Sequence, residues 1–252
     1  MSKVISIALR KGGSGKTTTA VNLASALQLR GHNTLLIDLE HTANATISVG
    51  IDPFTLTASI NTLFTDMDVQ PQDVLVKTDY GLTVLPATED LEQTEAGMTA
   101  THIGLLKPIV EALRDQFDFI IIDTPPGKSY LSLSALVASD YVLIPLQTHY
   151  LAMQGLVRIL DDVHKVKKGL NPRLEILGIL PTMVQPYTNI SKTVLHNVLE
   201  QYTDLVLPLE IKYSVKHAEA SLIGQPIVIY SPSHEGAQEY FKLAEVIYGK
   251  AT

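Results

Sequence analysis

Residues Arg10–Thr19 read RKGGSGKTTT, and this stretch decides the fold of the 252-residue chain. An apolar run, Val4–Leu9, precedes it, and the helix-length amphipathic stretch Lys16–Leu29 begins within it. Closely spaced glycines let the backbone curl so that successive N–H groups point at an anion, and a helix that starts there adds its positive end. The sequence therefore predicts a strand, a phosphate-binding loop and a helix in direct succession.

Two side chains of this loop fit the phosphates and the metal ion of a bound nucleotide. Lys16 supplies a positive charge for the β- and γ-phosphates, and the Thr17 hydroxyl is placed to bind Mg²⁺. The common loop has glycine six residues before the lysine, where this chain has Arg10, and a second lysine follows at Lys11. The residues expected to bind the nucleotide are Lys11, Gly12, Gly13, Ser14, Gly15, Lys16, Thr17 and Thr18.

Short apolar runs alternate with amphipathic stretches along the rest of the chain, which is typical of a mostly parallel α/β sheet. The expected strands are Val4–Leu9, Thr34–Ile37, Leu82–Leu85, Phe119–Ile122, Tyr141–Leu146 and Leu174–Leu180. The expected helices are Lys16–Leu29, ended by Gly31, and then His102–Gln116, Leu151–Lys168, Ile190–Gln201 and Ser233–Tyr248. Because no repeat, low-complexity tract or linker interrupts the pattern, we expect residues 1–252 to form a single domain, a twisted sheet with helices on both faces.

Acidic residues follow two of the expected strands at the sheet edge where ligands of open α/β folds bind. Asp123 ends the run Phe119–Ile122, where a carboxylate is costly to bury unless it faces a site. Holding Mg²⁺ through a water molecule is the natural task of a carboxylate there. Asp38 lies likewise at the end of the second expected strand, beside Glu40.

The glycine-rich loop resembles the deviant Walker A box of the ParA/MinD family of partitioning and positioning ATPases, in its small branch. The resemblance extends over essentially the whole chain, through Thr17–Ala24, Leu35–Glu40, Ile120–Pro126, Ile144–Gln147, Ala152–Leu156, Val215–Ser221 and Gly224–Ile227. It implies a fold of the P-loop NTPase type, with ATP and Mg²⁺ as cofactors and ATP hydrolysis as the activity.

The resemblance also implies roles for single residues. Lys11 would reach the phosphates of a second subunit, so that ATP holds a homodimer together and hydrolysis releases it. The family usually has D-x-D where this chain has Asp38 and Glu40, and the second acid is implicated in orienting the attacking water. Because the extra methylene of Glu40 moves the carboxylate by roughly an ångström, slow hydrolysis is expected, and it stays open which of the two acids orients the water. The expected catalytic residues are Lys11, Lys16, Asp38 and Glu40, and the expected metal ligands are Thr17 and Asp123.

The composition excludes several classes of protein. Hydrophobic residues make up 46% of the chain and charged residues 18%, which argues against a disordered chain. There is no cysteine, so zinc sites with cysteine ligands, iron–sulfur clusters and thiol catalysis are excluded. No apolar run is long enough to span a membrane, and the N-terminus reads as a strand rather than a signal peptide. We therefore expect a cytoplasmic protein. The resemblance to the ParA/MinD family implies that it associates with the nucleoid when ATP is bound.

The net charge of −7 hides an uneven distribution. Residues 31–115 contain 13 acidic and 3 basic residues, whereas residues 158–216 contain 8 basic and 6 acidic ones. A chain polarised in this way can present a basic face to DNA phosphates. The candidates for sequence-independent DNA contacts are Lys165, Lys167, Lys168, Arg173, Lys192, Lys212 and Lys216.

Three functions remain open at this point. The C-terminal helix carries as many acids as bases, so stable membrane association of the MinD type is not expected. The first strand begins at the N-terminus, so no helix-turn-helix is expected to read a DNA sequence. The sequence favours an ATP-dependent dimer that binds DNA and positions a plasmid, a chromosome region or an organelle such as the carboxysome, with a ParB-like or cargo-adaptor partner. The alternatives are a metabolic P-loop enzyme of the amidoligase or kinase type and a membrane-associated positioning ATPase.

Overall fold

The computed structural model describes residues 2–149, 152–185 and 187–251, and its centre is a seven-stranded sheet. The strand order is β3-β4-β2-β5-β1-β6-β7, with all neighbouring pairs parallel except β3 and β4. The strands are β1 Lys3–Ile7, β2 Thr34–Asp38, β3 Val76–Lys77, β4 Thr83–Leu85, β5 Phe119–Asp123, β6 Tyr141–Gln147 and β7 Glu175–Thr182. The expected fold class, a mostly parallel sheet of the P-loop type, is confirmed.

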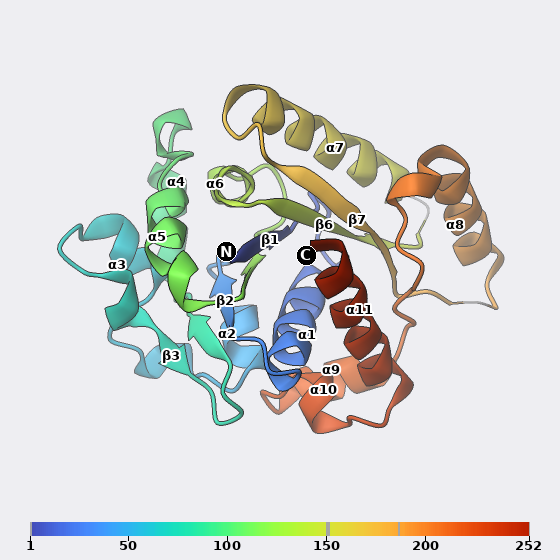
Figure 1. Ribbon diagram of the computed structural model, residues 1–252, viewed down its shortest axis with the longest axis horizontal. Helices are drawn as coiled ribbons and strands as arrows, with labels where there is room; N and C mark the ends of the chain where they lie inside the picture. Colours follow the sequence, from blue (N-terminus) through green and yellow to red (C-terminus); the bar gives the residue numbers. More distant parts are fainter. Residues whose placement is uncertain (1, 150–151, 186, 252) are drawn as a thin grey trace.

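Helices cover both faces of this sheet (Figure 1). The helices longer than one turn are α1 Lys16–Leu29, α2 Asn44–Ser48, α3 Ile60–Thr65, α4 Leu91–Gly97, α5 Leu106–Leu113, α6 Tyr130–Ala138, α7 Ala152–Gly169, α8 Asn189–Tyr202, α9 Val215–Leu222, α10 Ile227–Tyr230 and α11 Glu235–Ala251. Figure 1 shows α6 and α7 above the sheet, and α1 with α9, α10 and α11 below it.

The central strands are buried on both faces, so their side chains alternate between two cores. Ile5 and Ile7 of β1 pack with α1 and α11, whereas Val4 packs with α5 and α6 on the opposite face. β5 repeats the pattern, with Ile121 on the α1 side and Ile120 on the other. This two-sided burial explains the continuous apolar runs that the sequence shows.

The long elements agree with the expected ones to within a few residues, and the differences have physical causes. The expected helix His102–Gln116 is shorter, because α5 is regular only over Leu106–Leu113 and short 3₁₀ turns flank it at Ala100–His102 and Arg114–Gln116. The expected start of another helix, Leu151, lies outside the described residues. The edge strand β3 and the helices α2, α3, α4, α9 and α10 were not expected, because they are short. Helix α6 was not expected either, because its residues are apolar on nearly all sides and show no helical period.

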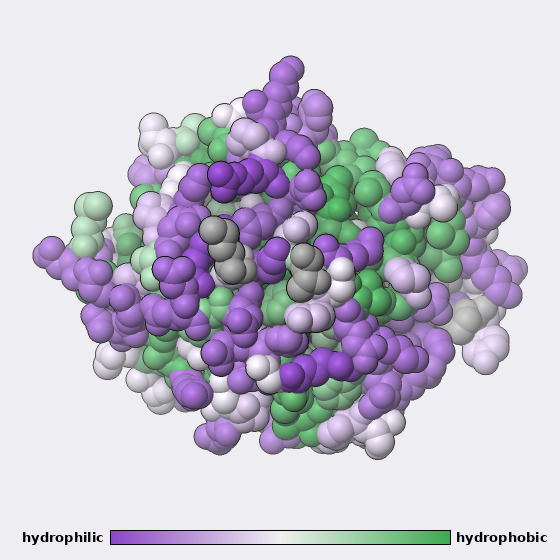
Figure 2. Space-filling model, in the orientation of Figure 1, coloured by the Kyte–Doolittle hydropathy of each residue, from purple (hydrophilic) through white to green (hydrophobic). Residues whose placement is uncertain are grey.

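The C-terminal end of α1 and the buried face of α11 both follow from the sequence. α1 ends as expected at Gly31, whose φ of 90° lets its N–H reach the Gln28 carbonyl while the His32 N–H reaches that of Leu27. α11 buries Tyr240, Leu243 and Ile247 in the core that it shares with α1. The apolar face of the C-terminal helix is therefore already occupied. Among the described residues no helix is long and apolar enough to cross a membrane, and hydrophilic side chains cover much of the face shown in Figure 2.

Candidate nucleotide-binding site

The phosphate loop connects β1 to α1 at the edge where the parallel strands end. Gly13 and Gly15 have φ values of 69° and 84°, in the left-handed region that a side chain disfavours. Gly15 is also the residue before α1, and no side chain accepts a hydrogen bond from the N–H groups of the first turn. An anion bound in the loop would accept hydrogen bonds from those N–H groups and would lie at the positive end of the α1 dipole.

Lys16 is the cation at the centre of the loop. Its side chain is buried, with 6% of the residue exposed, and its Nζ lies 3.5 Å from the Lys11 carbonyl oxygen. Burial lowers the pKa of the Lys16 ammonium, while the carboxylates of Asp123 and Glu40 act in the opposite direction. Lys16 is thus held in a desolvated position beside two acids, where a phosphate would be a strong partner.

Asp123 is fully buried, and neither of its carboxylate oxygens has a hydrogen-bond partner among the described residues. Burial raises the pKa of Asp123 well above its ordinary value, and the neighbouring Asp38 adds to the rise. The Thr17 hydroxyl and Lys16 oppose it. A buried carboxylate without a partner requires an explanation, and a cation supplies one. Because Mg²⁺ is commonly held by one or two carboxylates together with substrate phosphates, Thr17 and Asp123 fit this ion.

Asp38 has the opposite surroundings, although it is the register partner of Asp123 on the adjacent strand. Its Oδ2 accepts hydrogen bonds from the Thr46 N–H at 2.9 Å and the Thr46 hydroxyl at 2.8 Å, and its Oδ1 accepts one from the Glu40 N–H at 3.0 Å. Burial raises the pKa of Asp38 to about 6 despite these bonds. The Asp38 carboxylate therefore fixes the loop after β2 to α2, whereas the half-buried Glu40 side chain stays closer to the surface.

Lys11 differs from Lys16 in its position on the same loop. It is half-buried, and its Nζ donates a hydrogen bond of 3.3 Å to the Gln147 amide oxygen at the end of β6. The structure therefore brings together Lys16, Thr17, Asp123, Asp38 and Glu40 at one sheet edge, with Lys11 beside them but bound to a neutral partner.

A cavity of about 330 Å³ lies beside the loop and was missed by sequence reasoning. Gly15 and Thr18 of the loop and first turn line it, together with Met183, Ile211 and Tyr213 from the segments that follow β7. Pockets of this volume bind small organic ligands. The sequence holds no signal for it, because its walls come from loops far apart in the chain.

Comparison with known proteins finds relatives that match nearly the whole chain. A family model described as an AAA domain matches residues 2–176. The chain is 38% identical to the sporulation initiation inhibitor protein Soj of Bacillus subtilis over 98% of both chains. It is 35% identical to the chromosome partitioning protein ParA of Caulobacter vibrioides, over 98% of this chain and 94% of that one.

The chain belongs to the ParA/MinD family of P-loop ATPases. The fold is also that of cobyrinic acid a,c-diamide synthase from Mycobacterium smegmatis, solved with an ATP analogue and magnesium, with a TM-score of 0.84 and 35% identity. That likeness covers 97% of this chain and 93% of the other. ATP and Mg²⁺ are the cofactors of this ParA/MinD site, as the sequence predicted.

The basic residues expected to bind DNA do not form one surface in this ParA/MinD chain. Because α7 runs back along the sheet for 18 residues, about 27 Å, its last turn lies at the edge opposite the phosphate loop. The group at that far edge is Lys165, Lys167, Lys168 and Arg173, and the group on the loop side is Lys192, Lys212 and Lys216. The basic residues of this stretch therefore lie in two separated groups, and which of them contact DNA stays a prediction.

Several of these lysines are already paired with acids. Lys165 pairs with Asp161 at 2.6 Å, Lys216 with Glu219 at 2.6 Å, and Lys212 with Glu235. Lys167, Lys168 and Lys192 are exposed, and within the described ranges no carboxylate lies within salt-bridge distance of them. Paired lysines exchange one partner for another when they meet a phosphate, so they contribute less to DNA affinity than free ones.

His217 gives the site region a measurable pH dependence. Neither of its ring nitrogens has a hydrogen-bond partner in the described part of the chain, and burial, followed by the nearby His234, lowers its pKa to about 4. Below the ordinary histidine pKa of about 6.5 the unfolded chain takes up a proton that the folded chain refuses, so stability falls as the pH falls.

We predict that His217→Leu reduces the loss of unfolding free energy between about pH 7.5 and pH 5 by about 1–2 kcal/mol. Denaturant unfolding of the nucleotide-free protein at several pH values measures this difference. His196→Gln is the matched control, because the His196 side chain on α8 is 70% exposed. Equal pH dependence in the parent and in His217→Leu would contradict the prediction.

Proposed function

We propose that this chain is an ATP-timed switch that forms a homodimer with ATP, binds DNA without sequence preference and positions or segregates a cargo. A partner protein of the ParB or cargo-adaptor kind stimulates hydrolysis, and the ATP-bound dimer associates with the nucleoid in the cytoplasm. The observation that carries the proposal is the pair of lysines on one glycine-rich loop. Lys16 is buried beside the unpartnered Asp123, whereas Lys11 leaves the loop for a neutral partner.

In this proposal the residues of one chain prepare ATP for attack by water. ATP supplies the γ-phosphoryl group, and Mg²⁺ neutralises its charge when both are bound. Lys16 and the N–H groups of the loop bind the β- and γ-phosphates, while Thr17 and Asp123 hold the metal ion. Asp38 has all its hydrogen bonds inside the fold, so Glu40 is the acid that can orient the water.

The two acids should therefore respond differently to substitution. We expect Glu40→Gln to keep the fold and ATP binding but to slow hydrolysis by about 10²-fold, because positioning of the water is lost. We expect Asp38→Ala to lower the free energy of unfolding by about 1–3 kcal/mol, because Thr46 and the Glu40 N–H lose their acceptor. Single-turnover hydrolysis and denaturant unfolding of both variants measure the two effects. Parental hydrolysis in Glu40→Gln would return the water-orienting role to Asp38.

Lys11 is proposed to bind the phosphates of the partner subunit. Its hydrogen bond to Gln147 holds the side chain at the rim of the loop, and an exchange of a neutral amide for a charged phosphate is favourable. Two ATP molecules facing each other also require cations between them.

We predict that Lys11→Ala binds ATP with parental affinity but remains a monomer with ATP and Mg²⁺. Light scattering during size-exclusion chromatography measures the dimer, and a fluorescent ATP analogue measures the affinity. Lys16→Ala serves as the comparison, because it should lose ATP binding itself. An unchanged ATP-dependent dimer of Lys11→Ala would rule out the role across the interface.

The dimer also decides which lysines bind DNA. If Lys11 reaches the partner's phosphates, the two copies meet at the loop side of their sheets. Lys192, Lys212 and Lys216 lie on that side, so dimerisation gathers two copies of this group, whereas the lysines at the end of α7 stay at the far edges. Binding that depends on ATP therefore favours the loop-side group.

We predict that Lys192→Glu combined with Lys216→Glu abolishes ATP-dependent binding to duplex DNA and leaves the dimer intact. Lys167→Glu combined with Lys168→Glu, at the far edge, is the matched control and should retain binding. Because each phosphate contact contributes about −0.9 to the slope of log K against log salt, loss of four contacts per dimer removes roughly 3–4 from the slope. Gel shifts on two unrelated duplexes at several salt concentrations decide between the groups. If only the control variant, Lys167→Glu with Lys168→Glu, loses DNA binding, the DNA contacts lie at the end of α7 instead.

A second candidate function is a metabolic P-loop enzyme of the amidoligase type. The observation that favours it is the 35% identity to the Mycobacterium smegmatis protein described as cobyrinic acid a,c-diamide synthase. Assays of ATP turnover separate the two candidates. Stimulation by duplex DNA supports the switch, whereas amide formation from cobyrinic acid and glutamine supports the enzyme. The occupied apolar face of α11 argues against a third candidate, anchoring on a membrane.

A further inference from the structure

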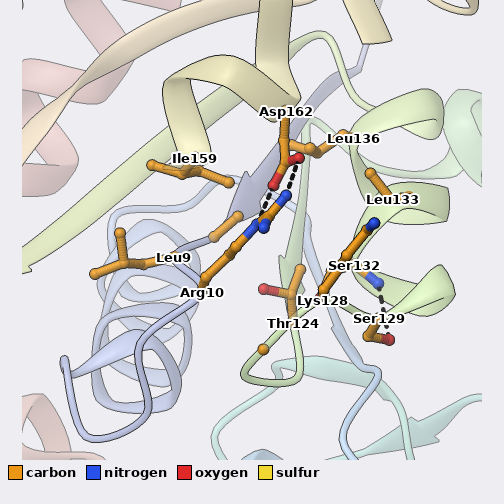
Figure 3. A pocket seen from close by; sticks show the side chains of 12 residues that line it. Leu9, Arg10, Thr124, Lys128, Ser129, Ser132, Leu133, Leu136, Ile159 and Asp162 are labelled. Carbon is orange, nitrogen blue, oxygen red and sulfur yellow. Dashed lines mark hydrogen bonds and ion pairs between the residues drawn. The ribbon is translucent and has the colours of Figure 1, made fainter. Parts of the chain in front are cut away.

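Arg10 stands where the common phosphate loop has glycine, and its side chain has a defined partner. Its Nε and Nη2 donate two parallel hydrogen bonds to the two carboxylate oxygens of Asp162 on α7 (Figure 3). Only 23% of the Arg10 side chain and 11% of the Asp162 side chain are exposed. The hydrogen bond to Asp162 is the largest of the causes that raise the pKa of Arg10. Two-pronged, largely buried pairs of this kind are strong and directional.

The backbone of Arg10 is fixed as firmly as its side chain. Its carbonyl oxygen accepts a hydrogen bond of 2.8 Å from the Gly127 N–H, in the loop that follows Asp123. Arg10, the first residue of the phosphate loop, is therefore bonded to two other elements, the long helix α7 and the loop after β5.

Helix α7 lies directly against the next residue of the loop. A methyl group built on Gly155 of α7 would lie 3.7 Å from Lys11 Cβ and 3.6 Å from Leu9 Cδ1. Both distances are ordinary van der Waals separations, so α7 packs closely against the base of the Lys11 side chain. Because Lys11 Nζ bonds to Gln147 at the end of β6, the direction of this side chain is set by β6 at its tip and by α7 at its base.

We propose that the Arg10–Asp162 ion pair positions Lys11 for contact with a second copy of the chain. It holds α7 against the loop, so that Lys11 leaves the loop toward the partner rather than toward its own bound ATP. The inference rests on the proposed role of Lys11 in the dimer. It assigns no direct contact with nucleotide to Arg10, whose guanidinium faces α7.

If the ion pair positions Lys11, its loss affects dimerisation but not the affinity for ATP. A purely structural ion pair would affect both. In the proposed mechanism ATP binding depends on Lys16 and the N–H groups of the loop, whereas the Arg10 guanidinium bonds to Asp162 on α7. Dimerisation with ATP depends on where Lys11 points. Loss of the pair should therefore weaken the dimer and leave the affinity of the monomer for ATP nearly unchanged.

The test uses Arg10→Gln, Asp162→Asn and the exchanged pair Arg10→Asp with Asp162→Arg. We expect ATP-dependent dimerisation at least tenfold weaker in both single variants, with affinity for a fluorescent ATP analogue within about twofold of the parent, and partial recovery of the dimer in the exchanged pair. Asp161→Asn is the matched control, because it removes an acid from the neighbouring position of α7, where the side chain pairs with Lys165. That control should dimerise as the parent does.

The outcomes distinguish this inference from the proposed function. If Lys11→Ala loses the dimer while Arg10→Gln and Asp162→Asn keep it, the positioning role is overturned and the proposed function stands. If Lys11→Ala keeps the ATP-dependent dimer, the role of Lys11 across the interface falls and the positioning role falls with it, whereas the proposed ATP-dependent dimer itself stands. A parallel loss of ATP affinity in the Arg10 and Asp162 variants would also overturn the positioning role. Should Arg10→Gln fail to fold, Arg10→Lys keeps the charge without the two-pronged geometry, and the same comparison of dimer and ATP affinity applies.

Discussion

The site depends on two carboxylates that are buried side by side at the ends of neighbouring strands. Asp38 of β2 and Asp123 of β5 are register partners, and neither residue is exposed. Like charges at this separation in a medium of low dielectric cannot both stay ionised without compensation. The structure compensates them differently, because Asp38 accepts three hydrogen bonds and Asp123 accepts none from the described residues. Only Asp123 is therefore left to face a cation.

The order of the strands places these carboxylates beside the phosphate loop. β5 lies between β2 and β1, so its end is flanked by Asp38 on one side and by the phosphate loop on the other. The loop contributes Lys16 and the Thr17 hydroxyl, and α1 contributes the positive end of its dipole. A cation bound beside Asp123 and a phosphate bound beside Lys16 would each give a buried charge at this edge an opposite partner. The cofactors ATP and Mg²⁺ are thus part of the electrostatic balance of the fold.

The sequence predicted the parts of this arrangement that depend on local pattern. The limits of α1, the left-handed Gly31 and the buried Asp123 could be read from spacing alone. The hydrogen bonds of Asp38 to Thr46 could not, because α2 has only five residues and no period. The cavity at Met183 and Tyr213 and the separation of the lysines on α7 from Lys192 depend on how distant segments meet. A count of charged residues along the sequence does not show at which edge of the sheet each of them lies.

Lys11 and Lys16 lie on one loop in different surroundings, which is the basis of the different roles proposed for them. Lys16 is desolvated between acids, so its ammonium gains most from a phosphate bound in its own loop. Lys11 is half-buried, and its ammonium donates a single hydrogen bond of 3.3 Å to the neutral Gln147 amide oxygen. A phosphate offers the same ammonium a negatively charged acceptor, so the contact with Gln147 yields when a phosphate comes within reach. The neutral partner keeps the side chain ordered at little cost, and an acidic partner in its place would oppose the exchange that a nucleotide-dependent dimer requires.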